Sequence, residues 1–321
     1  MKLRSFLLCL LFATPLTAND PWLVFEGGEG PGKGKNIVLI SGDEEYRSEE
    51  ALPMLGKMLA ERHGFTTTVL FAIDKETGEI NPDEQTNIPN MKAVSEADFV
   101  VMALRFRELP DADMKHLVDY VEAGKPLLGL RTSTHAFKYD RNKESPYAMW
   151  SFESKEWEGG FGRQILGETW VSHHGAHGKQ STRGVVNQEN SDHPLVRGVE
   201  DVWGDSDVYG VTKLPEDATV LMYGQVLSTM KPDSAPAEGK KNDPMMPIAW
   251  VREDRKVITS TMGAATDFVH PGLRRFVTNC AFWATGLDVP EDLDVTPVDE
   301  YSPTKFGVKK YQKGKKPEDF R

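Results

Sequence analysis

The strongest constraint on the fold is the alternation of short apolar segments with amphipathic segments between residues 36 and 130. The amphipathic segments Ser48–His63 and Asp111–Glu122 have helical spacing of apolar residues, and Gly64 and Gly124 are expected to end them. The apolar segments are expected to be buried strands: 36–41, 66–71, 99–103 and 126–130. Apolar strands joined by helices pair in parallel and are covered on both faces. The sequence therefore predicts an α/β fold with a mostly parallel sheet between two layers of helices.

The rest of the chain is less regular. Strands are expected at 164–171, 182–187 and 218–226, a hairpin at 247–251 and 256–261, and a closing helix at 272–285. We expect one domain over residues 36–288 with an irregular insert at about 138–203, preceded by a Gly/Pro-rich leader at 19–35 and followed by an extended tail at 289–321. The run 27–34 lacks the Ser or Thr of a phosphate loop and precedes the first strand, so we expect a flexible connection there.

The first 18 residues have the three-part pattern of a secretory signal. Lys2 and Arg4 precede an apolar run at 6–12, and uncharged residues follow as far as Ala18, where cleavage is expected. The apolar run is too short to span a bilayer, and the large residues before Cys9 do not suit a lipid anchor. The sequence therefore predicts a secreted or periplasmic protein.

Charge and cysteine content narrow the class of partner. The formal net charge is −11, and it becomes more negative once Lys2 and Arg4 are removed with the leader. Such a surface repels nucleic acid and anionic membranes, so neither is an expected partner. After cleavage Cys280 has no second cysteine to pair with, so the core alone must stabilise the fold.

Several short motifs, taken in order, resemble the ThuA-like (trehalose utilisation) family, a branch of the class I glutamine amidotransferase-like superfamily. The resemblance spans roughly residues 36–288, and it rests on the segments 40–47, 129–132, 192–194, 203–209, 247–250 and 274–283. It implies a flavodoxin-like layered fold and a role in sugar metabolism. In the amidotransferases the turn reads Gly-Ile-Cys-x-Gly, but Arg131 stands at the Cys position here and Ser133 replaces the second Gly. Because a guanidinium cannot attack an amide, glutaminase chemistry is excluded.

Polar residues follow three of the expected strands, at the edge where open parallel sheets bind ligands. We expect Asp43 and His135 to transfer protons and Arg131 to clamp an anionic or hydroxylated ligand. Further substrate contacts are expected from Glu44, Tyr46, Arg47, Arg105 and Thr132. The alternatives are that Glu44 caps the following helix and that Arg131 is a structural residue held by Asp43 or Asp207.

A histidine cluster is the clearest signal in the second half. His173 and His177 could bind zinc, with Asp207 or His135 as a further ligand. Gly175 and Gly178 indicate a loop rather than the helix of a metalloprotease. The alternative is that His173 and His174 donate hydrogen bonds to a sugar.

Two further segments offer polar groups to the same edge of the sheet. Asp207 and Tyr209 follow Trp203, a combination that suits a pyranose ring, although the aromatic residues could equally belong to the core. Asp267 follows the last expected strand.

The sequence supports three hypotheses about function. The first is an enzyme of carbohydrate metabolism that acts on a saccharide or an oxidised sugar derivative, with Asp43, His135 and Asp207 as catalytic residues. The second is a carbohydrate-binding protein without turnover. The third is a zinc-dependent hydrolase built on the His173–His177 cluster, and zinc is the one cofactor that the sequence suggests. The sugar and the oligomeric state stay open.

Overall fold

A ten-stranded sheet forms the centre of the molecule. The structure is a computed structural model that describes residues 20–321, so the expected signal sequence lies outside the described residues. The strand order is β1-β3-β2-β4-β5-β12-β11-β10-β7-β8. In chain order the strands are β1 (Trp22–Phe25), β2 (Asn36–Gly42), β3 (Thr66–Phe71), β4 (Phe99–Leu104), β5 (Leu127–Leu130), β7 (Thr182–Val186), β8 (Val202–Gly204), β10 (Thr219–Val226), β11 (Met246–Arg252) and β12 (Val257–Ser260). A separate two-stranded sheet pairs β6 (His173–His174) with β9 (Val208–Tyr209).

The sheet has a parallel centre and antiparallel flanks. Strands β3, β2, β4, β5 and β12 pair in parallel, whereas β11, β10, β7 and β8 continue the sheet in antiparallel pairing. The parallel strands are buried along almost their whole length because both faces are covered. Alternate side chains of β2 divide between two cores: Ile37 and Leu39 enter one, and Val38 and Ile40 enter the other.

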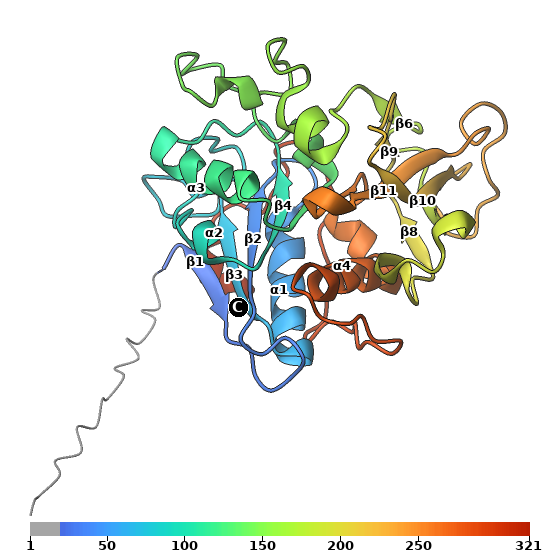
Figure 1. Cartoon of the computed structure of the whole chain (residues 1–321), viewed down its shortest axis with the longest axis horizontal. Helices are drawn as coiled ribbons and strands as arrows, with labels where there is room; N and C mark the ends of the chain where they lie inside the picture. Colours follow the sequence, from blue (N-terminus) through green and yellow to red (C-terminus); the bar gives the residue numbers. More distant parts are fainter. Residues whose placement is uncertain (1–19) are drawn as a thin grey trace, which may run out of the picture.

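Helices cover both faces of this sheet. Helices α1 (Ser48–His63) and α4 (Pro271–Ala284) lie side by side on one face, where His63 meets Phe282 (Figure 1). Helices α2 (Ala93–Glu96) and α3 (Asp111–Glu122) pack on the other face. Gly64 ends α1 in the left-handed conformation, as the sequence indicates. The predicted three-layer α/β fold is confirmed.

Short helical turns occur between the strands of the second half, before α4 and in the C-terminal tail. They are η1 (Arg131–His135), η2 (Ala148–Trp150), η3 (Gly162–Leu166), η4 (Gln188–Asn190), η5 (Pro194–Val196), η6 (Glu253–Arg255), η7 (Ala265–Val269) and η8 (Pro317–Phe320). The strand expected at 164–171 is wrong, because η3 occupies its first residues and irregular backbone follows. The Leu166 carbonyl accepts hydrogen bonds from the side chains of Trp250 and Thr259 instead of entering a strand ladder. The predicted hairpin of β11 and β12 is present.

The leader is packed rather than flexible. Strand β1 pairs antiparallel with β3 at the edge of the sheet. A side chain at Gly27 or Gly30 would overlap the backbone at the end of α1, and one at Gly32 would overlap Phe65. The glycines therefore allow the leader to cross the end of α1 in close contact.

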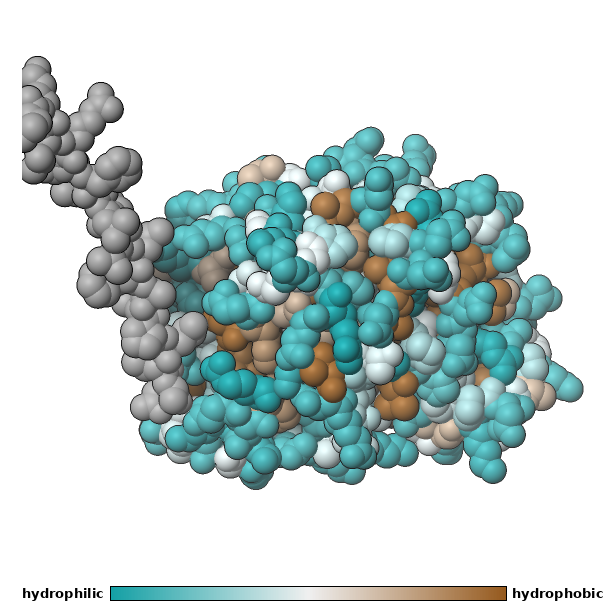
Figure 2. Space-filling view, turned by 90° about the horizontal axis from the view of Figure 1, so that it is seen from below, coloured by the Kyte–Doolittle hydropathy of each residue, from teal (hydrophilic) through white to brown (hydrophobic). Residues whose placement is uncertain are grey.

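The tail after α4 returns across the domain and is held on α1. Thr304 donates hydrogen bonds from its backbone nitrogen and its hydroxyl to Glu50, and the backbone nitrogen of Ile80 donates to the Lys315 carbonyl at 2.7 Å. The face in Figure 2 is mainly hydrophilic, with apolar residues in separate small areas. Among residues 20–321, no helix has the length and apolar character to cross a membrane.

Candidate functional site

A small pocket lies beyond the carboxyl ends of β4 and β5. Its volume is about 50 Å³. Segments from both halves of the chain line it: Glu45, Arg105, Phe106, His135, Trp170, His173 and Tyr209. The loops after β2, β4 and β5 thus meet the segments around β6 and β9 at the edge where parallel sheets bind ligands. The sequence predicted Arg105, His135, His173 and Tyr209 there and offered Glu45 and Trp170 as weaker candidates, but it gave no signal for Phe106.

Arg131 occupies the sharp turn after β5, but its side chain is not open to a ligand. The residue has a positive φ of 43° and is 1% exposed. Its Nη1 donates to the Asp207 carbonyl at 2.6 Å and to Ser206 Oγ and the Thr261 carbonyl at 3.2 Å. These bonds join η1 to the second half of the chain. The expected ligand clamp is therefore corrected to the structural alternative, in which Arg131 is held at Asp207.

Two tyrosines enclose this guanidinium. Its carbon lies 3.7 Å from the ring centre of Tyr46 and 5.0 Å from that of Tyr209. Burial opposes its charge, but Tyr46, Tyr209 and nearby carboxylates outweigh that cost and raise the pKa of Arg131 well above its usual value. Arg131 is therefore a permanent positive charge, and the ring of Tyr46 packs on this guanidinium instead of lining the pocket.

Asp43 has both carboxylate oxygens occupied by the protein. Oδ1 accepts hydrogen bonds from the backbone nitrogens of Glu45 and Tyr46 at 2.8 and 3.1 Å. Oδ2 accepts from Thr132 Oγ1 at 2.8 Å. The side chain is 1% exposed and does not line the pocket. Asp43 and Thr132 thus tie the loop after β2 to η1, and the geometry does not favour Asp43 as a proton-transfer group.

Arg105 joins two carboxylates at the pocket. Its Nη1 donates to Glu45 Oε2 at 2.6 Å, and its Nε lies 3.5 Å from Glu44 Oε1. Burial, followed by the charge of Asp43, raises the pKa of Glu44 to about 7. Glu44 itself lies behind Arg105 and is not a lining residue. Arg105 and Glu45 present the charged groups that a ligand would meet.

His135 lies at the floor of the pocket among aromatic rings. Its ring centre is 5.3 to 5.9 Å from those of Phe106, Tyr209, Trp170 and Phe152. Burial, together with the charges of Arg105, Arg131 and His173, lowers the pKa of His135 well below its usual value. The imidazole is therefore neutral at neutral pH, and its surroundings make it a weak base.

The histidine loop is built around Asp207. His173 Nδ1 lies 2.6 Å from Asp207 Oδ2, and His177 Nδ1 lies 2.9 Å from Asp207 Oδ1. Gly175 passes so close that a side chain there would have its Cβ 3.0 Å from the Asp207 Cβ. Burial raises the pKa of Asp207, but the bonds with both imidazoles and the charge of Arg131 outweigh it and lower the pKa below its usual value. A buried carboxylate thus orients two half-exposed imidazoles.

Three predicted contacts lie away from the pocket. Arg47 is buried between Glu49 and the Gly307 carbonyl, and His174 Nε2 pairs with the Lys241 carbonyl at 2.8 Å. Asp267 accepts hydrogen bonds from Ser206 and from the backbone of Gly263 and Ala264. These residues support the loops, so the prediction that they bind substrate directly is corrected.

The C-terminal tail completes one side of the site. Its backbone nitrogens at Gly307 and Lys309 donate to the carbonyls of Glu45 and Glu44 at 2.8 and 3.0 Å. The Phe306 ring lies 5.4 Å from Tyr46 and 5.7 Å from His177, measured between ring centres. The tail therefore fixes the loop after β2 and touches the histidine loop. This contact had no signal in the sequence, because the tail shows no periodic pattern.

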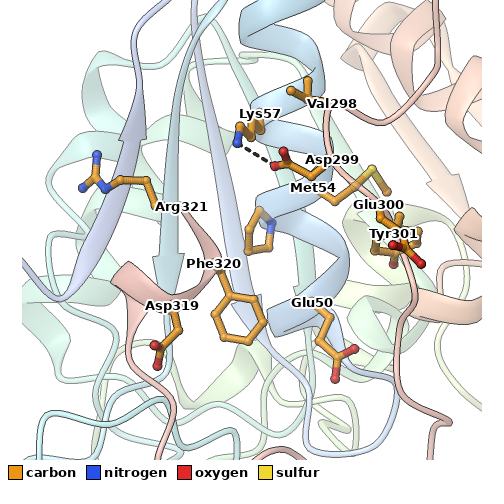
Figure 3. A pocket seen from close by; sticks show the side chains of 11 residues that line it. Glu50, Met54, Lys57, Val298, Asp299, Glu300, Tyr301, Asp319, Phe320 and Arg321 are labelled. Atoms are coloured by element: carbon orange, nitrogen blue, oxygen red, sulfur yellow. Dashed lines mark hydrogen bonds and ion pairs between the residues drawn. The ribbon is translucent and has the colours of Figure 1, made fainter.

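A second cavity of about 190 Å³ lies between α1 and the tail (Figure 3). Lys57 bonds Asp299 across it at 2.6 Å, and the side chain of Phe320 lines another part of the same cavity. Its lining contains no imidazole or thiol. The acid/base groups gather instead at the smaller pocket.

Comparison with known proteins identifies the family. The family model for ThuA, described as trehalose utilisation, matches residues 36–284. A ThuA-like protein from Bacteroides uniformis ATCC 8492 superposes with a TM-score of 0.51 at 15% identity, over 81% of this chain and 94% of that one. A ThuA-like protein from Parabacteroides merdae ATCC 43184 superposes with a TM-score of 0.48 at 14% identity, over 90% of this chain and 99% of that one. The glutaminase domain of CTPS from Trypanosoma brucei superposes with a TM-score of 0.38 at 10% identity, over 81% of this chain and 98% of that one. Comparison with curated proteins gave no significant match. From the family match over most of its length, the chain belongs to the ThuA family.

Proposed function

We propose that this chain is a secreted or periplasmic enzyme of carbohydrate metabolism that acts on a saccharide or an oxidised sugar derivative by acid/base chemistry. The observation that carries the proposal is the convergence of polar groups and aromatic rings on one pocket. Glu45, Arg105, His135 and His173 provide the acid, base and hydrogen-bonding groups, and Phe106, Trp170 and Tyr209 provide the rings. Hydroxyl groups and the apolar face of a sugar ring match this combination.

The size of the pocket limits what can enter it. A single water needs at least about 10 to 15 Å³ of such volume. A pocket of about 50 Å³ therefore accepts a few atoms, such as one edge of a sugar ring. The rest of a disaccharide would lie over the half-exposed histidine loop, beside His173 and His177.

His135 is the proton-transfer group in this proposal. It lines the pocket and is neutral, so one ring nitrogen has a lone pair that can take a proton, and its lowered pKa means that it releases the proton again readily. Burial raises the pKa of Tyr209 well above its usual value, so its hydroxyl keeps its proton. Tyr209 thus suits hydrogen bonding to the substrate, and Asp207 orients His173 and His177 without needing contact with the sugar.

The class of substrate and the location rest on other grounds. The family is described by trehalose utilisation, which favours a disaccharide or its derivative. The first 18 residues have the pattern of a secretory signal, which favours a place outside the cytoplasm.

The test is a product assay on His135→Gln. Trehalose, other disaccharides and their carbonyl-containing derivatives are incubated with each protein, and products are followed by NMR. Loss of a general base should lower kcat by about 10²- to 10⁴-fold with a smaller change in KM. His270→Gln, at a histidine that pairs with Asp201 away from the pocket, is the control that should keep its rate. Saccharide binding without product in the unaltered protein would favour the carbohydrate-binding alternative, and neither binding nor product would reject the proposal.

A further inference from the structure

We propose that His173, His177 and Asp207 form a binding site for one divalent transition-metal ion that prefers imidazole ligands, such as Zn²⁺. The inference builds on the proposed function, because the ion would lie at the edge of the same pocket. One donor atom from each residue lies within 4.8 Å of the other two. Two imidazoles and a carboxylate are a common set of protein ligands for such ions.

The separations between donor atoms fit a shared ion. Ligands about 2.1 Å from one ion are about 3.0 Å apart when they meet at a right angle, and about 3.4 Å apart in a tetrahedron. His173 Nδ1 lies 2.6 Å from Asp207 Oδ2 and His177 Nδ1 lies 2.9 Å from Asp207 Oδ1, so an ion between the imidazoles would meet one or both oxygens of this carboxylate. These separations would have to widen by about 0.1 to 0.8 Å to convert the hydrogen-bonded arrangement into a coordinated one.

The loop can make these movements, whereas the carboxylate is fixed. Asp207 is 0% exposed, but the side chains of His173 and His177 are 36% and 41% exposed. Gly175 and Gly178, both with positive φ, flank the second histidine. A rigid carboxylate and two adjustable imidazoles leave the solvent side of the cluster open. Three protein ligands with an open position are typical of catalytic rather than structural zinc sites.

The surrounding charges select the kind of ion. Arg131 Nη2 lies 3.6 Å from Asp207 Oδ1 and partly neutralises that carboxylate. This disfavours Ca²⁺ and Mg²⁺, which depend on oxygen ligands and negative charge. Glu45 Oε1 lies 3.6 Å from Nε2 of His177, which is the ring nitrogen that does not bond Asp207, so this carboxylate can bind the second ring nitrogen. Such outer partners orient imidazole ligands and raise metal affinity.

The bound ion would polarise an oxygen of the substrate or a bound water. His173 both belongs to the cluster and lines the pocket, so a substrate oxygen at the pocket edge can reach the open position. This explains why two imidazoles gather on one buried carboxylate when a single hydrogen-bonded pair would orient His173.

The test measures metal binding directly. Full-length protein without a histidine tag is purified without chelator, analysed for metals by mass spectrometry, and then titrated as the metal-free form with Zn²⁺ and with Co²⁺, whose absorption spectrum reports imidazole coordination. We expect one ion per chain. Since loss of an outer partner alone typically costs 10- to 100-fold in affinity, His173→Gln and His177→Gln should each weaken binding by at least about 100-fold. Both histidines are half-exposed, so these variants should fold.

His174→Gln is the matched control, because it lies in the same loop but pairs with the Lys241 carbonyl. It should retain one ion per chain. Equal Zn²⁺ affinity in His173→Gln and His174→Gln, or no Zn²⁺ binding in the unaltered protein, would overturn the site and leave a hydrogen-bonded cluster only. Metal binding without saccharide turnover would reject the proposed function but keep the metal site. Saccharide turnover by a protein that binds no metal would keep the proposed function but reject the metal site.

Discussion

The two walls of the pocket are built in opposite ways. The first wall consists of the loops at 43–47, 105–107 and 131–135, and the second wall consists of 170–177 and 207–209. In the first wall the charged side chains are buried and bonded to protein, as Asp43 and Arg131 are. In the second wall His173 and His177 are half-exposed on a loop that contains glycine.

This difference indicates that the first wall mainly supports the structure of the site and that the second wall mainly offers groups to a ligand. Buried polar groups that bond to other groups of the protein stabilise a geometry, and a substrate cannot reach them. Exposed imidazoles oriented by one buried carboxylate keep a free nitrogen for a ligand. Changes in the first wall should therefore cost mainly stability, and changes in the second wall should cost mainly activity. Glu45, Arg105, Phe106 and His135 are the exceptions, as first-wall residues that line the pocket.

The largest effect is expected for Arg131→Ala. It removes the buried partner of Asp207 and the cation between two tyrosine rings, which should cost about 3 to 5 kcal/mol of unfolding free energy. Urea denaturation measures it. Arg105→Ala, whose side chain is 18% exposed, should cost markedly less. Equal effects of the two substitutions would mean that burial does not distinguish support from contact in this wall.

His173→Gln should show the reverse pattern. We expect turnover to fall about 100-fold, as is common when a group that assists proton transfer or orients a substrate is lost. The free energy of unfolding should change by less than about 1 kcal/mol, because the ring is half-exposed. Parallel kinetics and urea denaturation provide the two values. A large loss of stability with normal turnover would place His173 among the supporting residues.

Gly175→Ala tests whether the loop must lie directly on Asp207. Its φ of 114° is unfavourable for alanine, and its Cβ would be 3.0 Å from the Asp207 Cβ, so we expect a loss of about 2 kcal/mol. Gly178→Ala has a φ of 69° and no atom within 4 Å, so it should lose only about 1 kcal/mol. Thermal denaturation of both variants compares them. If Gly178→Ala destabilised the protein more than Gly175→Ala, close packing on Asp207 would not be the reason that position 175 requires glycine.

The smallest effect concerns Glu49, next to Arg47 behind the first wall. Burial outweighs the nearby Arg47 and raises the pKa of Glu49 to about 7. A carboxyl with a raised folded-state pKa stabilises the fold below its unfolded pKa, and this stabilisation is lost as the pH rises through about 7. When the pH rises from 5 to 8, the melting temperature of Glu49→Gln should therefore fall less than that of the unaltered protein. Identical pH profiles would show that Glu49 is ionised in both states.

The sequence predicts the helices and strands that carry the first wall, but it does not predict the side-chain contacts within that wall. Apolar runs and stop residues predict α1, α3 and β3 with the bounds that the structure shows, because local periodicity determines them. Arg131 was misread as a clamp, because its partners Ser206, Asp207 and Thr261 are more than 70 positions away and no local pattern indicates them.

The second wall shows the opposite balance. The sequence singled out His173, His177 and Asp207, because clustered imidazoles are rare in loops, and the structure brings them together. It failed on the backbone that carries them: the strand expected at 164–171 is absent, and β6 and β9 were not expected. Bonds from distant side chains decide that backbone, as the two hydrogen bonds to the Leu166 carbonyl show.

The position of Phe306 against Tyr46 and His177 has a consequence for how the protein matures. Every residue of both walls precedes the tail in the chain, so both walls are synthesised before Phe306. The core of the domain can form first, but the loop after β2 gains its bonds to Gly307 and Lys309 only when the tail docks. We therefore expect a chain that ends before Phe306 to lack these bonds at the loop after β2 and the aromatic contact at the histidine loop.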